Sequence, residues 1–176
     1  MLLALMVSGC ASVPRVVRLE QPDPGRPSPI CIKVEPFSDA RADKTRIGVA
    51  RNGFYWPTGS ASTDDDVAQW VATHLRASLS PDSCVPELVV EGRIREVFVD
   101  EYFNLNARFV VSLRLERGRT LIFDRDFETT YSQLSHLGTS AEFQETLRKG
   151  LASFGERAIP AIIAAAADVR PMPPGL

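Results

Sequence analysis

The feature that most constrains the fold is a long stretch in which apolar and polar residues alternate. Over residues 104–116 every second side chain is apolar. A period of two places these side chains on one face of a β-strand. Residues 86–100 before this stretch and 120–132 after it are also rich in β-forming residues, and Arg117-Gly118 supplies a turn between the last two segments. The pattern predicts an antiparallel meander of three strands, with a bulge in the first near Gly92 or Glu96.

Two further segments carry apolar residues at helical spacing. The first, residues 67–79, follows three aspartates at 64–66, which complement the exposed N–H groups and the dipole of a helix start, and Ser80-Pro81 ends it. The second begins at a capping box, Thr139-x-x-Glu142, and continues past a kink expected at Gly155 or Pro160. The aspartates could also suggest a divalent cation, but adjacent residues of one helix diverge.

The region before the first helix predicts more irregular β-structure. Residues 30–37 alternate as a half-buried strand, and segments 46–50 and 54–56 flank a tight-turn signal at Arg51-Asn52-Gly53. The element order is therefore β, hairpin, α, β, β, β, α. We predict an α+β fold, a two-layer sandwich in which two helices cover one face of a mixed, mainly antiparallel sheet.

Length and charge limit the function classes. The 176 residues suit one domain, and the net charge of -2 does not indicate a nucleic-acid-binding surface. The hydrophobic content of 44% is too high for a disordered chain. No apolar run reaches the roughly 20 residues that a membrane-spanning helix needs.

The N-terminus suggests where the protein is located in the cell. Residues 1–9 are apolar or small and lead directly into Cys10, and Val7-Ser8-Gly9-Cys10 resembles the lipobox of bacterial lipoproteins. In those proteins the chain is cut before the cysteine, which is then acylated, and several acyl chains anchor a protein stably. We expect residues 1–9 to be the remnant of a signal peptide and Cys10 to be lipidated with palmitate or a similar acyl group. The alternative is an apolar N-terminus that happens to contain a cysteine.

The prolines predict how the rest of the chain is divided. Five of them lie between positions 14 and 29, which favours extended chain. We expect residues 10–29 to be a lipidated, proline-rich tether or simply an N-terminal arm, residues 30–170 to be the periplasmic domain, and residues 171–176 to be a disordered tail.

Two cysteines remain once Cys10 is set aside. Cys31 opens the first predicted strand and Cys84 lies just before the strand at 86–100, with a helix between them. Parallel strands joined in this way start at the same end of a sheet, so a disulfide between them is expected in an oxidising compartment. The alternative is two unpaired cysteines that pack as small apolar residues.

The sequence offers no motif for catalysis, metal binding or a cofactor. Only two histidines occur, His74 beside the apolar stripe of the first helix and His136 next to Ser135 in a loop. Zinc-binding, nucleophile-elbow and phosphate-loop patterns are missing. We therefore predict no catalytic residues, no metal and no cofactor.

Exposed aromatic residues are the more promising candidates for binding. Phe54, Tyr55 and Trp56 follow the tight turn, and Tyr102 and Phe103 lie between two predicted strands. Aromatic residues in loops can form a partner-binding patch, or they can fold over the sheet as a lid.

Several runs resemble the YajG-like bacterial lipoproteins. They are Val34-Glu-Pro-Phe-Ser-Asp-Ala-Arg41 with Ile47-Gly48, Asn106-Ala-Arg-Phe-Val-Val-Ser-Leu-Arg-Leu115, and Phe127-Glu-Thr-Thr-Tyr131 before the helix from Ala141. Leu88-Val-Val-Glu-Gly-Arg-Ile94 is also similar to auxiliary lipoproteins of ABC-type transport systems and loosely to the LptE group. The resemblance covers most of residues 30–168. It implies an α+β domain that faces the periplasm and no catalytic residues, and transport auxiliaries imply a protein partner.

These observations lead to one leading hypothesis and two alternatives. The leading one is a non-enzymatic lipoprotein anchored to the outer membrane, where it acts as an accessory or adaptor subunit of an envelope or transport complex. Ala11 after Cys10 resembles lipoproteins that are sorted to the outer membrane. The alternatives are a periplasmic carrier of a lipid or other apolar ligand, which requires an enclosed apolar pocket, and an enzyme with dispersed residues.

Overall fold

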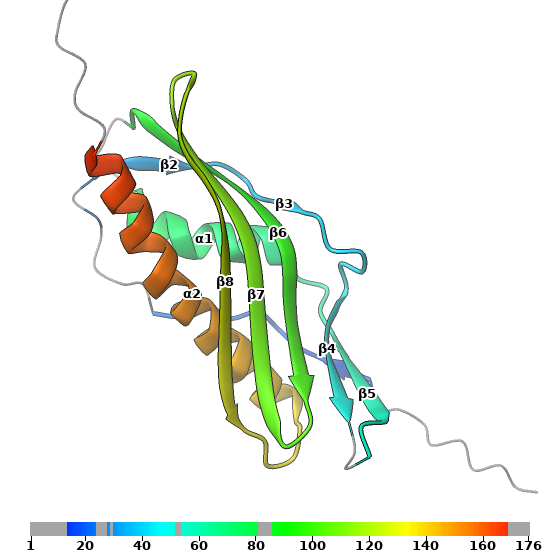
Figure 1. Cartoon of the computed structure of the whole chain (residues 1–176). Helices are drawn as coiled ribbons and strands as arrows, with labels where there is room; N and C mark the ends of the chain where they lie inside the picture. Colours follow the sequence, from blue (N-terminus) through cyan, green and yellow to red (C-terminus); the bar gives the residue numbers. More distant parts are fainter. Residues whose placement is uncertain (1–13, 24–27, 29, 52–53, 81–85, 169–176) are drawn as a thin grey trace, which may run out of the picture.

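Eight strands form one open mixed sheet, and two helices cover one of its faces (Figure 1). The structure is a computed structural model that describes residues 14–23, 28, 30–51, 54–80 and 86–168. The predicted two-layer α+β fold is confirmed. The elements are β1 (Arg15–Val16), β2 (Ile32–Val34), β3 (Ser38–Asp39), β4 (Arg46–Arg51), β5 (Pro57–Ser62), α1 (Val67–Leu79), β6 (Leu88–Glu101), β7 (Asn104–Arg117), β8 (Thr120–Leu134) and α2 (Ser140–Asp168).

The three long strands form the predicted meander. β7 lies between β6 and β8 and is antiparallel to both along its whole length. The predicted bulge occurs in β6, where the register shifts between Ile94 and Glu96. The alternating apolar side chains of β7 all face the helices and are fully buried: Ala107, Phe109, Val111, Leu113 and Leu115.

On the side of β6 away from β7, three short strands pair with it one after another. β2 pairs with its beginning, β3 with its middle and β4 with its end, and all three run parallel to it. β5 and then β1 extend the sheet beyond β4, so that the order is β1-β5-β4-β6-β7-β8. The other border of the sheet is β8, which pairs only with β7 among the described strands.

The ends of both helices follow the local signals in the sequence. The Asp66 carboxylate caps α1 by accepting a hydrogen bond of 2.9 Å from the Gln69 N–H. Thr139 and Glu142 form the predicted capping box at the start of α2. α2 is one continuous helix that includes both Gly155 and Pro160, the two positions at which we expected a kink. Pro160 lies on the exposed side of the helix, where the missing hydrogen bond can be replaced by water.

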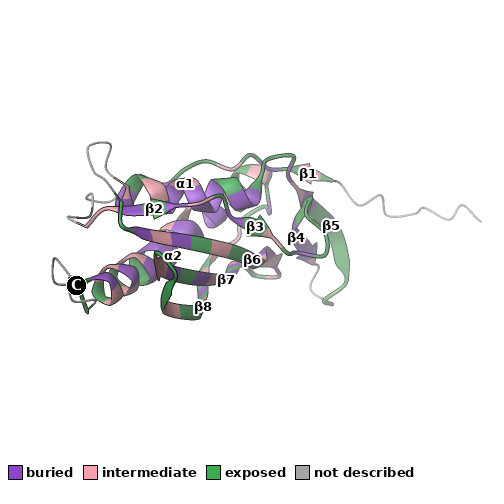
Figure 2. Ribbon diagram, turned by 90° about the horizontal axis from the view of Figure 1, so that it is seen from above, coloured by how far each residue is buried: buried purple, intermediate pink, exposed green. Residues whose placement is uncertain are grey.

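Side chains fill the space between the sheet and the helices. Phe109 of β7 lies 6.4 Å, ring to ring, from Phe154 of α2, which also meets Phe127 of β8 edge to face at 6.4 Å. Figure 2 shows the buried residues gathered where the helices face the sheet. Glycines permit this approach, since a Cβ on Gly150 of α2 would come within 2.5 Å of the Phe109 ring. None of the helices in the described ranges is long and apolar enough to cross a membrane.

Two parts of the N-terminal region differ from expectation. The second strand of the hairpin is β5, at 57–62, while residues 54–56 belong to the turn that precedes it. The proline-rich arm also packs on the domain along residues 14–23 instead of standing free. The Val17 N–H donates to the Ser62 carbonyl at 2.8 Å, and the indole N–H of Trp70 donates to the Glu20 carbonyl at 3.0 Å. Burial of Val17 explains why this part of the arm is held.

Candidate functional site

Three connections meet at one end of the sheet. β4 is parallel to β6, with Ala50 opposite Glu101, so the turn after β4 lies beside the turn after β6. β8 ends opposite the start of β7, which brings the loop between β8 and α2 to the same place. We call this region the aromatic end. It comprises Phe54, Tyr55 and Trp56, Tyr102 and Phe103, and Leu134 and Leu137.

The sequence-predicted aromatic residues come together there. The ring of Tyr55 stacks on that of Tyr102 with the centroids 4.1 Å apart, and Tyr102 lies 4.2 Å from Phe103. Tyr55 has a φ of 66°, a backbone conformation that is uncommon for a residue with a side chain. The Arg51 guanidinium holds the turn by donating to the Tyr55 carbonyl at 3.3 Å and to the Asp100 carboxylate at 2.8 Å.

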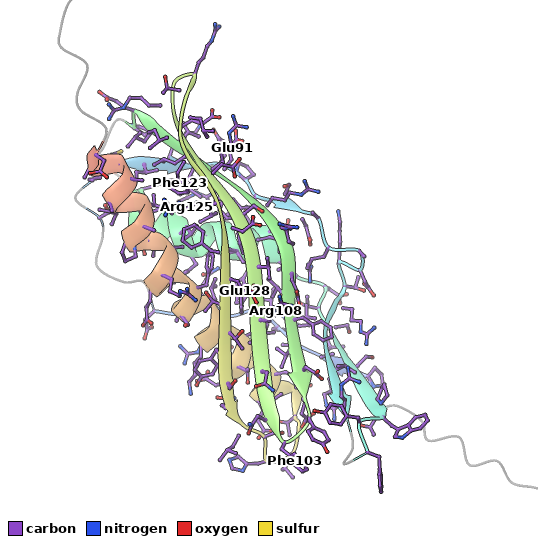
Figure 3. All side chains as sticks on the ribbon, viewed as in Figure 1. Glu91, Phe103, Arg108, Phe123, Arg125 and Glu128 are labelled. Atoms are coloured by element: carbon purple, nitrogen blue, oxygen red, sulfur yellow. The ribbon has the colours of Figure 1, made fainter. Side chains whose placement is uncertain are left out.

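These side chains are exposed and do not fold over the sheet as a lid. Phe54 is 83% exposed, Tyr55 62%, Trp56 70% and Phe103 66%, and the neighbouring Leu134 and Leu137 are 71% and 81% exposed. Phe103 lies at the tip of the β6–β7 turn in Figure 3. The two leucines were not predicted, since apolar residues in a loop show no periodicity. Several large apolar side chains exposed at one end of a sheet are typical of an interaction site.

The loop between β8 and α2 is held in place by hydrogen bonds. The Ser135 hydroxyl donates to the Glu101 carboxylate at 2.6 Å, and the Ser135 N–H donates to the Phe103 carbonyl at 3.2 Å. Gly138 has a φ of 58° and lies directly against the Glu101 carboxylate. The exposed leucines are therefore presented by an ordered backbone.

Glu142 of the capping box also binds this loop. Its carboxylate accepts hydrogen bonds from the N–H groups of His136 at 2.9 Å, Leu137 at 3.2 Å and Thr139 at 2.9 Å. Partial burial raises the pKa of Glu142, but these hydrogen bonds outweigh it and hold the pKa below its ordinary value. The carboxylate stays ionised at neutral pH and keeps the loop on the helix start.

The N-terminal strand enters the domain beside the aromatic end. The Arg15 guanidinium donates to the Gly138 carbonyl and lies 5.8 Å from the centre of the Phe143 ring. β1 is parallel to β5, with Arg15 opposite Ala61. Since β5 runs away from the aromatic end, the N-terminal end of β1 points toward it. Cys10 itself lies outside the described residues.

One cleft contains the residue types of a nucleophilic triad. Asp23, His74 and Ser78 line it together with Glu156 of α2. Burial lowers the pKa of His74 to about 4, and the Ser78 hydroxyl is buried without a hydrogen-bond partner. No hydrogen bond links the serine to the histidine, so the geometry supplies no activated nucleophile.

The second histidine is not paired with a nucleophile either. The hydroxyl of Ser135 is bound to Glu101, while the His136 side chain is exposed. Across the described ranges, no three histidine, cysteine or acidic side chains converge as metal ligands. Asp66 of the aspartate run serves as the cap of α1.

The outer face of the sheet carries charged pairs across neighbouring strands. Arg108 of β7 lies 3.0 Å from Glu128 of β8 and 3.0 Å from Glu96 of β6 (Figure 3). Asp126 accepts from the Ser112 hydroxyl at 2.6 Å and pairs with Arg95 at 2.6 Å. These pairs form a solvated surface.

The border strand β8 offers a second candidate surface. Arg157 of α2 donates to the Glu128 carbonyl at 2.8 Å, which places the backbone groups of Glu128 on the side away from β7. Beside this border, an apolar groove of about 400 Å³ lies between the start of β8 and the last turns of α2. Its lining includes Phe123, Phe127, Ala161 and Ala165.

Cys31 is one of the two cysteines of the predicted disulfide. It directly precedes β2, which is parallel to the start of β6 with Ile32 opposite Leu88. The predicted partner, Cys84, lies outside the described residues, so the pairing of the two stays a prediction.

Comparison with known proteins supports the fold. No family model matches the chain, and no curated protein matches its sequence. A crystal structure of a DUF330 protein from Xanthomonas campestris is similar with a TM-score of 0.61 at 12% identity, over 88% of this chain and 97% of that one. An uncharacterized protein has a TM-score of 0.54 at 12% identity, over 84% of this chain and 97% of its own.

A hypothetical protein from Chlamydia trachomatis is also similar, with a TM-score of 0.50 at 13% identity, over 78% of this chain and 99% of its own. At these identities the likeness establishes the fold alone, and the YajG-like and LptE-like resemblances stay predictions. The chain thus shares the α+β architecture of the DUF330 protein, across nearly the full length of that protein.

Proposed function

We propose that the protein is a bacterial lipoprotein, held at the periplasmic face of the outer membrane through Cys10, that serves as a non-enzymatic accessory subunit of an envelope complex. The lipobox-like Val7-Ser8-Gly9-Cys10 supports the anchor. The transport-auxiliary resemblance of residues 88–94 supports a protein partner. The unlinked serine and histidine in the α1–α2 cleft give no support for catalysis.

A filled core beneath exposed interaction surfaces carries this proposal. An accessory protein needs a packed domain that presents surface, whereas a carrier needs an interior cavity for its ligand. The rings of Phe109, Phe143 and Phe154 are fully buried between sheet and helices, where a carrier would hold its ligand. Large apolar side chains are instead exposed at the aromatic end.

The border strand β8 fits a protein partner that adds a strand to the sheet. Alternate residues of a strand direct their backbone groups to the same side, so Thr130 shares the outward side with Glu128. An added strand would bind these groups and place its side chains against the groove beside α2. Charged side chains on β8, including Asp124 and Arg125, disfavour non-specific pairing of this edge strand with strands of other proteins.

The groove beside β8 favours one alternative function. Its phenylalanines and alanines would also suit an acyl chain or another ligand with an apolar part, and Arg125 and Asp168, which line the same groove, could face a polar head group. Extraction of the purified full-length protein with organic solvent, followed by mass spectrometry, would detect such a ligand at near one equivalent. If no ligand can be extracted, the carrier function is contradicted and the accessory role is retained.

Crosslinking in native membranes tests the accessory role. Wild-type protein should capture a defined set of envelope proteins, and Cys10→Ala should fractionate as soluble and lose them. Thr130→Pro removes one outward N–H of β8, whereas Thr130→Ala keeps it. The proline variant should lose the partner and the alanine variant should retain it. A wild-type protein that is soluble and captures nothing contradicts both the anchor and the accessory role.

A further inference from the structure

We propose that the aromatic end docks on the lipid bilayer, with Phe54, Trp56 and Phe103 entering the interfacial region beside the acyl anchor. This inference rests on the proposed lipidation of Cys10 and goes beyond it. An acyl anchor alone leaves the domain free to take any orientation. Contact through the aromatic end would fix the long strands at a steep angle to the membrane.

The course of the chain places the anchor near this end. Four peptide links separate Cys10 from Pro14, the first described residue, and even when fully extended they span at most about 14 Å. The N-terminal end of β1 points toward the aromatic end, because β1 is parallel to β5 and β5 starts there. The Arg15 guanidinium fixes this entry point on Gly138. A bilayer that holds Cys10 therefore lies within reach of the aromatic end.

The side chains at the aromatic end have the chemistry of a membrane interface. Tryptophan and tyrosine concentrate where headgroups meet hydrocarbon, since their rings are apolar and their N–H or O–H groups stay hydrated. Trp56 and Tyr55 are 70% and 62% exposed, and Phe54, Phe103 and Leu137 add wholly apolar side chains at the same tip. Exposed apolar side chains gain free energy when they leave water for the interface.

The polar groups near this surface are already bonded within the protein, which lowers the cost of approaching lipid. Arg51 pairs with Asp100 at 2.8 Å, and Glu101 accepts from Ser135 at 2.6 Å. The Tyr102 N–H donates to the Asn104 carbonyl at 3.1 Å. The contact is therefore mainly apolar, and its strength should depend little on salt concentration.

Tryptophan fluorescence can test the docking, because the chain has two tryptophans in opposite environments. Trp56 is 70% exposed at the aromatic end and Trp70 is 5% exposed in the core. Full-length acylated protein carrying Trp70→Phe would be reconstituted into vesicles of phosphatidylethanolamine and phosphatidylglycerol. Trp56 emission should shift to the blue by about 10 nm, and bromine on the upper acyl carbons should quench it at least twofold.

Two matched proteins control this measurement. In Trp56→Phe the remaining Trp70 should be unaffected by brominated lipid, which also shows that the core stays intact. In Leu121→Trp with Trp56→Phe and Trp70→Phe, the reporter lies at the opposite end of the sheet, where Leu121 is 48% exposed. Quenching of this reporter to the same degree as Trp56 would overturn a fixed orientation.

A second measurement tests membrane binding of the aromatic end in protein that lacks the acyl anchor. Full-length Cys10→Ser should partition weakly into the same vesicles, and Trp56→Ser with Phe103→Ser in that background should lower the partition coefficient at least fivefold. Leu121→Ser should leave it unchanged, and 0.5 M salt should change it less than twofold. Equal partitioning of the aromatic and the Leu121 variants contradicts the docking.

The remaining outcomes distinguish the proposed acyl anchor at Cys10 from the proposed docking of the aromatic end. Acylated, vesicle-bound protein whose Trp56 is not quenched overturns the docking and leaves the anchor in place. Trp56 emission that is already blue-shifted before vesicles are added indicates a second copy or a protein on this surface, and it also overturns the docking. Protein from membranes that mass spectrometry shows to be without acyl groups overturns the proposed anchor, and the docking fails with it.

Discussion

The two ends of the long strands are built from the same kind of element but from different chemistry. Each end has a tight connection in the meander, at Tyr102–Phe103 and at Arg117–Arg119. At the aromatic end the exposed side chains are large and apolar. Among the described residues at the opposite end, the exposed side chains are mostly charged, and Leu121 near the start of β8 is the large apolar residue that is exposed there.

This contrast shows that exposure of the aromatic residues does not follow from their place in a turn. The β7–β8 turn reverses the chain with Gly118 and two arginines, as an ordinary solvated turn does. The aromatic end instead holds its apolar side chains in place by stacking and by bonds from Arg51, Ser135 and Glu142. Ordered, exposed apolar surface is a feature that a solvated turn does not need.

Acid should destabilise the core that joins the two ends, because His74 is buried there. His74 is buried and its pKa is lowered to about 4, whereas the unfolded chain binds a proton near pH 6.5. The unfolded state therefore binds more protons between these values, and stability falls as the pH is lowered from 6.5 toward 4. We expect a loss of about 2.5 kcal/mol between pH 7.5 and pH 4.5.

Urea unfolding at both pH values measures this loss, and His74→Gln should reduce it to a fraction. A variant that loses as much stability as the wild type would show that another group governs the acid response. Comparisons of the two ends should accordingly be made at or above pH 7.

Two glycines, one at each end, share a backbone conformation but differ in their surroundings. Gly138 at the aromatic end and Gly118 at the charged end have nearly the same φ, 58° and 60°. An added Cβ at Gly118 meets nothing within 4 Å, whereas at Gly138 it meets the Glu101 carboxylate. Gly118→Ala should cost about 1 kcal/mol of unfolding free energy from backbone strain alone. Gly138→Ala should cost about 2–3 kcal/mol, because it also disturbs the Glu101–Ser135 hydrogen bond.

Chemical denaturation of the two variants side by side provides the measurement. Equal losses would mean that the loop between β8 and α2 is not held by Glu101, and the aromatic end would then be less ordered than described.

The ionised Glu142 should make a smaller, pH-dependent contribution. Because its folded pKa is lowered, its stabilisation is complete above the unfolded value of 4.5 and is lost as the pH falls through the folded value. Glu142→Gln should cost about 1 kcal/mol at pH 7. The difference from wild type should shrink as acid protonates the Glu142 carboxylate, since both side chains are then neutral, and a difference that stays constant through acid unfolding would refute the charge argument.

The smallest effect is expected at the charged end. Glu87 and Arg117 form an ion pair with a nitrogen–oxygen distance of 3.9 Å, and the Glu87 side chain is largely exposed. Glu87→Ala should change the unfolding free energy by less than about 0.5 kcal/mol. A loss above 1 kcal/mol by urea unfolding would show that this end is also held by specific contacts.

Local patterns predicted the central part of the fold and its helix starts. The meander, the bulge before Glu96 and the Thr139–Glu142 box all depend on residues close together in the sequence. The hairpin was misplaced, because aromatic residues 54–56 favour strands while Pro57–Ser62 does not. Pairing with β4 and β1 makes that weak segment a strand, and such a tertiary effect has no local signal.

The sequence predicted the aromatic residues of the candidate site, but it did not predict that they lie together or that other residues join them. Tyr55 and Tyr102 lie far apart in the sequence, and the parallel pairing of β4 with β6 brings them into contact. Leu134, Leu137 and the entry of the chain at Arg15 join the same end through β8 and β1. No periodicity at those residues indicates where they lie.

The sharing of the β6 edge has a consequence for the order of folding. β2 and β3 depend on β6, which lies much later in the sequence, whereas β4 can first pair with the adjacent β5, and β6, β7 and β8 meet across short turns. Local contacts close sooner than distant ones, so we expect the meander to nucleate and β2 and β3 to add to it. If the chain is translocated N-terminus first, β2 and β3 would lack their sheet partner until β6 follows, and a chaperone could bind this segment.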